Sequence, residues 1–120
     1  MGNVLKDKSF RFALRIVRLA RFLSSNRKEY VLNKQLLRSG TSIGALNSEA
    51  EFAQSKSDFV HKLSIALKEA NETRYWLKLL HCGDYLTEKM YKSLLPDIDE
   101  LIKLLVSSIK TAKSNIKANM

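Results

Sequence analysis

Apolar residues recur every three or four positions along four segments of this chain, and short polar stretches separate the segments. This period matches the turn of an α-helix and predicts amphipathic helices over roughly residues 7–25, 32–54, 57–82 and 87–116. Because short connections make consecutive helices antiparallel neighbours, the pattern predicts an all-α, up-down-up-down four-helix bundle. A chain of 120 residues suffices for one hydrophobic core, so residues 1–120 are expected to form a single domain.

The third segment has the most regular pattern of the four. Its apolar seam alternates spacings of four and three residues, at Phe59, Leu63, Ala66, Ala70, Thr73, Leu77 and Leu80. Ser55 and Ser57 offer N-caps before this helix, and Gly83 is expected to cap its end. In the fourth segment, Pro96 is expected either to kink the helix or to begin its main part.

The first two segments indicate contacts beyond those of a simple bundle. Apolar residues cover more than half of the circumference of the first helix, at Phe10, Phe12, Ala13, Leu14, Ile16, Val17, Leu19, Ala20 and Leu23. In the second segment, Gly40 and Gly44 lie four residues apart on one face and suggest close packing of another helix, because glycine is otherwise unfavourable within a helix. A phosphate-binding loop is excluded, since no strand precedes these glycines and no Gly-Lys-Ser/Thr sequence follows them.

Positive charge is concentrated near the start of the chain. The net charge is +9, and residues 1–30 carry eight basic and two acidic side chains. Lys8, Arg11, Arg15 and Arg18 fall within an arc of about 80° on the first helix. Three readings of this basic face stay open: a solvated face, a docking site for an acidic protein or membrane, and a nucleic-acid surface. The planar arginine fork suits phosphate oxygens.

Three glutamates near the predicted helix seams are candidates for a subunit contact: Glu49, Glu69 and Glu72. The simpler interpretation pairs Glu69 and Glu72 with cations such as Arg74 on the same helix or Arg38 on the preceding one. If they were buried between subunits, they would need arginines opposite them.

The sequence offers no constellation for catalysis, a cofactor or a metal. His61 and His81 are too far apart to form a metal pair, neither follows a glutamate by three residues, and both are expected at the surface or its boundary. Cys82 is the single cysteine and is expected as a half-buried thiol near a helix end. No apolar run can span a bilayer and residues 1–9 lack the apolar core of a signal peptide. We therefore expect a cytoplasmic protein that is not an enzyme and has no membrane partner.

Four stretches of the sequence carry a family resemblance. They are LLRSGTSIGA at 36–45, AQSKSDF at 53–59, KLSIALKEA at 62–70 and ETRYWL at 72–77. Together they closely resemble bacterial four-helix bundle proteins encoded in intervening sequences of 23S rRNA genes, which are sometimes labelled as ribosomal proteins because of that genomic location. The chain departs from the family at Leu46, where an asparagine is usual, and keeps the following glutamate as Glu49.

The resemblance implies an assembly and a class of partner. It implies a ring-like homopentamer, similar to the accessory variability protein of diversity-generating retroelements. That relative resembles a basic, barrel-shaped partner of nucleic acid and of a reverse transcriptase. A pentamer agrees with the wide apolar arc of the first helix and with the two close-packing glycines. The leading expectation is a non-enzymatic oligomer that binds structured RNA or DNA through the first helix. The alternative is a ring-shaped scaffold whose basic surface docks a partner protein.

Overall fold

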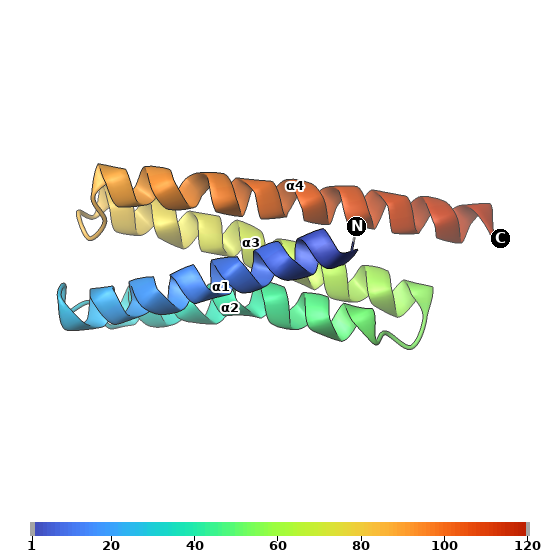
Figure 1. The fold of residues 1–120 in the computed structure, drawn as a ribbon, viewed down its shortest axis with the longest axis horizontal. Coiled ribbons are helices and arrows are strands. Elements are labelled where there is room, and N and C mark those ends of the chain that lie inside the picture. Colours follow the sequence, from blue (N-terminus) through green and yellow to red (C-terminus); the bar gives the residue numbers. More distant parts are fainter. Residues whose placement is uncertain (1, 120) are drawn as a thin grey trace.

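Four helices make up most of the computed structural model, which describes residues 2–119 (Figure 1). They are α1 (Gly2–Ser25), α2 (Val31–Glu51), α3 (Lys56–Cys82) and α4 (Glu88–Ala118). Each helix packs against the next one in the chain, and α1 also contacts α4, so the four helices surround one core. This arrangement confirms the predicted all-α up-down bundle, whose extents are 53 × 22 × 20 Å. Within residues 2–119, no helix is both long enough and apolar enough to cross a membrane.

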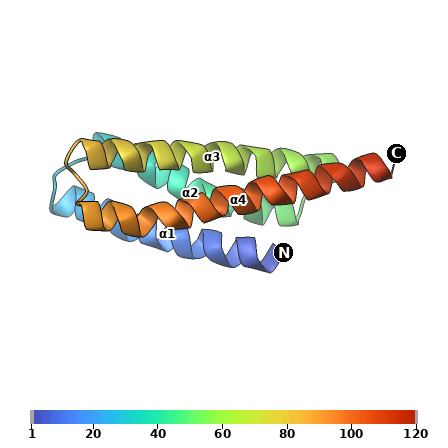
Figure 2. The same cartoon turned by 90° about the horizontal axis from the view of Figure 1, so that it is seen from above.

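The helices begin and end within a few residues of the predicted positions, with one larger difference. Helix α1 begins at Gly2 rather than near residue 7, because Leu5, only 3% exposed, packs into the core ahead of the periodic stretch. Helix α4 runs beyond the predicted end to Ala118, and its last turns project past the N-terminal end of α1 (Figures 1 and 2). Pro96 lies inside α4, so it does not begin the main part of that helix.

The turn between α2 and α3 explains why α2 stops at Glu51 instead of continuing to residue 54. The hydroxyl of Ser55 accepts a hydrogen bond from the backbone N–H of Asp58 at 3.0 Å, and the Asp58 carboxylate accepts one from the N–H of Gln54 at 3.2 Å. This reciprocal cap requires an extended Ser55, and so the chain must leave the helical conformation before it.

Helix α3 ends at the predicted glycine, but the strained backbone position falls on the next residue. Gly83 occupies the C-cap with φ of −86°, and its N–H donates to the carbonyl of Leu79 at 2.9 Å. Asp84 takes the left-handed conformation, with φ of 68°. Aspartate tolerates that region better than most side chains, so the turn does not depend on a left-handed glycine.

The core is built from the predicted seams of all four helices. Its largest fully buried side chains include Phe12, Ile16, Leu23, Leu36, Ile43, Leu63, Leu77, Leu80, Ile98, Leu101 and Leu105. Part of the apolar arc of α1 lies outside this core, since Phe10, Leu14 and Val17 are 64%, 40% and 41% exposed. One chain therefore leaves part of its apolar α1 surface uncovered.

Helix α1 leaves less room for a side chain at Gly40 than at Gly44. A Cβ atom at this position would lie 2.9 Å from both Cγ1 and Cγ2 of Ile16, whereas a Cβ atom at Gly44 would lie 3.5 Å from the backbone oxygen of Ser9. Ile16 is β-branched and fully buried, and therefore has no free rotamer that would make room. Gly40 is thus required by the α1–α2 contact, while Gly44 tolerates a methyl group.

We expect Gly40→Ala to lower the free energy of unfolding and Gly44→Ala to leave it unchanged or raise it. Overpacking costs about 1–3 kcal/mol, which exceeds the roughly 1 kcal/mol that alanine gains over glycine in a helix. Urea unfolding of both variants at one protein concentration measures the difference. Equal effects of the two substitutions would contradict the close contact at Gly40.

Candidate nucleic-acid interface

The basic residues of α1 do not form a free cationic face, because two of them reach across to acids on α4. Lys8 Nζ lies 2.9 Å from Oε1 of Glu100, and Arg15 Nη1 lies 2.6 Å from Oδ2 of Asp97. Arg15 also donates to the carbonyl oxygen of Ser93 at 3.0 Å and to its hydroxyl oxygen at 2.7 Å. These contacts make the predicted basic face one side of the α1–α4 seam.

The other two predicted residues, Arg11 and Arg18, differ in their surroundings. Arg11 forms an ion pair within α1 with Asp7, at 3.2 Å. Arg18 is exposed and forms no ion pair with any of the described residues 2–119. Exposed ion pairs of this kind contribute about 0–1 kcal/mol each. A phosphate group can therefore compete with the acidic partners of Lys8 and Arg11. The binding free energy gained there is smaller than at Arg18, which has no ion pair to break.

Cations without an ion pair gather at two places in the described part of the chain. One lies at the end of the bundle that carries the α1–α2 and α3–α4 connections, which sit side by side in Figure 1. The unpaired cations in and beside that end are Arg18, Arg21, Arg27, Lys28, Lys34, Lys78 and Lys89. The other place is the second half of α4, with Lys103, Lys110, Lys113 and Lys117. Unbalanced positive charge thus lies mainly outside the predicted four-residue face.

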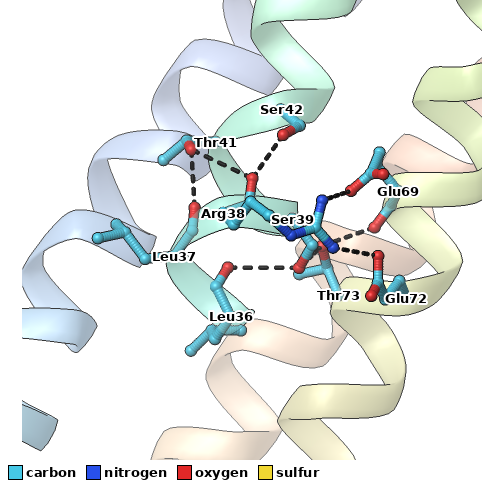
Figure 3. Close-up of polar contacts among 9 residues, drawn as sticks. All are labelled: Leu36, Leu37, Arg38, Ser39, Thr41, Ser42, Glu69, Glu72 and Thr73. Carbon is cyan, nitrogen blue, oxygen red and sulfur yellow. Dashed lines mark hydrogen bonds and ion pairs between the residues drawn. The ribbon is translucent and has the colours of Figure 1, made fainter. Parts of the chain in front are cut away.

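The predicted glutamates meet a cation from the neighbouring helix. Arg38 of α2 places Nη1 2.9 Å from Oε2 of Glu69 and Nη2 2.6 Å from Oε2 of Glu72 (Figure 3). Beneath this bridge, the buried hydroxyl of Thr73 donates to Oγ of Ser39 at 2.9 Å. The simpler of the two interpretations therefore describes how Glu69 and Glu72 are placed: both are satisfied within one chain.

The bridge also sets the ionisation of Glu72. The hydrogen bond from Arg38 holds the pKa of Glu72 below its ordinary value, against an opposing effect of burial. The same hydrogen bond raises the pKa of Arg38. Glu49, the third predicted glutamate, lies apart from this cluster and pairs with Lys62 of α3 at 3.2 Å.

His81 and Cys82 are neighbours at the end of α3, and His61 lies near the start of the same helix. His61 is exposed, while the half-buried His81 lies 2.8 Å from Oε2 of Glu88 and stacks on the Tyr91 ring at 4.3 Å between centroids. The prediction of a half-buried thiol is wrong, since Cys82 is exposed where α3 runs into its terminal turn. Within the described residues, no group of three or more His, Cys, Asp and Glu side chains could hold a metal ion.

Comparison with known proteins confirms the family resemblance. A family model described as "23S rRNA-intervening sequence protein" matches residues 3–107. The chain belongs to this family. It is similar to a crystal structure of a protein with unknown function from the S23 ribosomal protein family of Bacteroides thetaiotaomicron, with 59% identity and a TM-score of 0.90 over 91% of this chain and 97% of that chain. No curated protein matches the chain.

The sequence pattern did not reveal the surroundings of Leu46 or the ion-pair partners of Asp97 and Glu100. Leu46, where the family resemblance led us to expect an asparagine, is half-buried and packs against the core. Asp97 and Glu100, the partners of α1, stand three residues apart on one face of α4. That spacing was visible in the sequence, but the angle at which α4 faces α1 was not.

We expect the pKa of Glu72 to rise toward its ordinary value of about 4.5 in an Arg38→Gln variant. Since the folded state favours the carboxylate, Glu72 stabilises the fold above its unfolded pKa, and the contribution is lost as the pH falls through the lower folded pKa. NMR titration of the Glu72 carboxyl carbon measures the pKa directly.

Arg74→Gln is the matched control for this titration. It removes an equal charge from α3, but Arg74 pairs with Asp99 at 2.7 Å and not with Glu72. The pKa of Glu72 should therefore stay low in the control. An ordinary Glu72 pKa in the unmodified protein would show that the Arg38 bridge does not form in solution.

Proposed function

We propose that this protein is a non-enzymatic homo-oligomer that binds structured RNA or DNA through its unpaired cations. One observation carries the proposal: of 21 Lys and Arg side chains, eight pair with an acid among the described residues, and most of the others gather in two regions. Local excess of positive charge attracts polyanions and releases counterions on binding. The number of subunits implied by the family resemblance is five.

Oligomer formation is supported by the apolar surface that one chain leaves open. A groove of ≈ 570 Å³ runs between α1 and α2, with Phe10 on its wall and Ala13, Gly44 and Ala45 along it. Val17 and Leu37, 41% and 38% exposed, continue the apolar surface on the same two helices. A second copy seated here would cover side chains that otherwise face water. Five copies would also combine five sets of weak phosphate contacts, which raises avidity.

The cationic surface favours recognition of the nucleic-acid backbone over recognition of base sequence. Arg and Lys side chains on helices contact phosphate oxygens, and the described residues contain no aromatic-rich sheet on which bases could stack. The name of the family points to 23S rRNA intervening sequences, so an RNA hairpin from such a sequence is the natural first probe.

We expect Phe10→Lys to dissociate the oligomer without unfolding the chain. The ring is 64% exposed in one chain, so a charged replacement costs little in the monomer but would be buried at the proposed contact. Light scattering measures the mass, and circular dichroism checks the helices. Tyr75→Lys is the control, because Tyr75 is 58% exposed on α3, away from the groove, and should leave the mass unchanged. A monomeric unmodified protein would overturn the assembly.

We further expect the protein to gain the mass of a structured RNA at low salt and to lose it steeply as salt rises. For duplex regions each phosphate contact contributes about 0.9 to the slope of log binding constant against log salt concentration. Light scattering across a salt series measures both effects. An oligomer that ignores RNA at every salt concentration would contradict nucleic-acid binding and favour a scaffold that docks a partner protein.

A further inference from the structure

An open groove of ≈ 440 Å³ separates α1 from α4 near the end of the bundle that carries the unpaired cations. Its apolar lining consists of Phe22, Met90, Leu19 and Leu94. Arg18 lines it from α1 and Lys89 lines it from α4. The groove therefore joins an apolar surface to two cations that have no ion pair within residues 2–119.

The contacts of Arg15 hold this groove in place. Its guanidinium bonds to Ser93 and Asp97, so it ties α1 to α4 at one end of the groove, where the two helices otherwise pack less closely than any other adjacent pair. Arg18 lies nearly one turn further along α1, and Lys89 lies about one turn before Ser93 on α4. One arginine is thus occupied in positioning the helices, while the two neighbouring cations remain available.

Two other grooves of the described structure lack this combination. The groove of ≈ 390 Å³ further along the same seam also carries cations, but Asp97 and Glu100 line it with them. The groove of ≈ 300 Å³ at the far end contains Lys6 together with its partner Glu51, which lies 3.6 Å away. Acids in both grooves thus pair with cations of the lining, whereas the groove of ≈ 440 Å³ contains no acidic residue.

We propose that the α1–α4 groove binds an unpaired nucleotide of a single-stranded nucleic-acid segment, with the base against Phe22 and Met90 and its phosphate between Arg18 and Lys89. This inference rests on the proposed nucleic-acid binding and assigns it a site. A base stacks on an aromatic ring or packs against a thioether, and its phosphate pairs with cations beside it. A paired base cannot enter, because its faces are covered by its neighbours in the duplex.

Neighbouring side chains extend the surface beyond one nucleotide. Arg21 lies three residues after Arg18 on α1 and is exposed. Arg27 donates to the carbonyl of Asp84 and lies over the Tyr85 ring at 5.7 Å, so its position between the two connections is fixed. These cations offer contacts to the phosphates that flank the bound nucleotide, which favours a strand over a free nucleotide.

The test compares binding of a single-stranded oligoadenylate and of an RNA duplex of equal length to variants of the full chain. Arg18→Gln with Lys89→Gln should weaken single-strand binding about tenfold or more and lower the magnitude of the salt slope by about 0.7, the value for one lost phosphate contact on a single strand. Lys56→Gln with Lys68→Gln removes the same charge from exposed, unpaired positions of α3 that lie outside both groups of cations, and binding should stay within about twofold of the unmodified protein.

Phe22→Leu tests the base contact separately from the charge. It keeps an apolar side chain but removes the ring, so single-strand affinity should fall about fivefold or more at an unchanged salt slope. Quenching of 2-aminopurine in the oligonucleotide reports stacking and should be lost in this variant. Circular dichroism and urea unfolding confirm that the variant is folded, and Phe22→Tyr, which restores a ring, should recover both affinity and quenching.

The outcomes separate this proposal from the proposed function. If the unmodified protein binds no nucleic acid, both fail. If it binds but prefers the duplex, or if the groove and control double variants lose equal affinity, the groove is not the site while nucleic-acid binding stands. Binding of polyglutamate as tightly as oligoadenylate, with Phe22→Leu unaffected, would assign the groove to an acidic protein and overturn the nucleotide proposal.

Discussion

The close contact between α1 and α2 at Gly40 determines how the surface of this protein is divided. Because Ile16 packs directly on the α2 backbone, α1 has one orientation about its own axis. That orientation turns Phe10 and Val17 outward beside α2 and turns Lys8 and Arg15 toward α4. The uncovered apolar surface and the cationic seam are therefore two results of one packing constraint.

Acids on α4 then decide which cations remain available. Asp97 and Glu100 form ion pairs with Arg15 and Lys8 of α1. The positive charge without an acidic partner therefore lies at Arg18 and at the α1–α2 and α3–α4 connections. A charge cluster read along one helix overestimates the free charge whenever a neighbouring helix supplies counterions. The Arg38 bridge to Glu69 and Glu72 gives the same result on the other side of the bundle.

Features that depend on neighbours along the chain were predictable, while those that depend on helix rotation were not. The α3 seam from Leu63 to Leu80 and the cap at Ser55 follow from local spacing, and both are confirmed. Placement of Arg15 against Asp97 joins residues 82 positions apart and requires the angle between α1 and α4. The groove between Arg18 and Lys89 was hidden for the same reason, and the early start of α1 reflects packing of Leu5 rather than propensity.

The order of packing around the bundle has a consequence for folding kinetics. Three of the four helix contacts join consecutive helices, and such short loops close at little entropic cost. Low contact order of this kind gives rapid folding through helical hairpins. Only the α1–α4 seam links the two ends of the chain, and it is also the most loosely packed. We therefore expect this seam to close late in folding and its opening to be a sub-global fluctuation of low free energy.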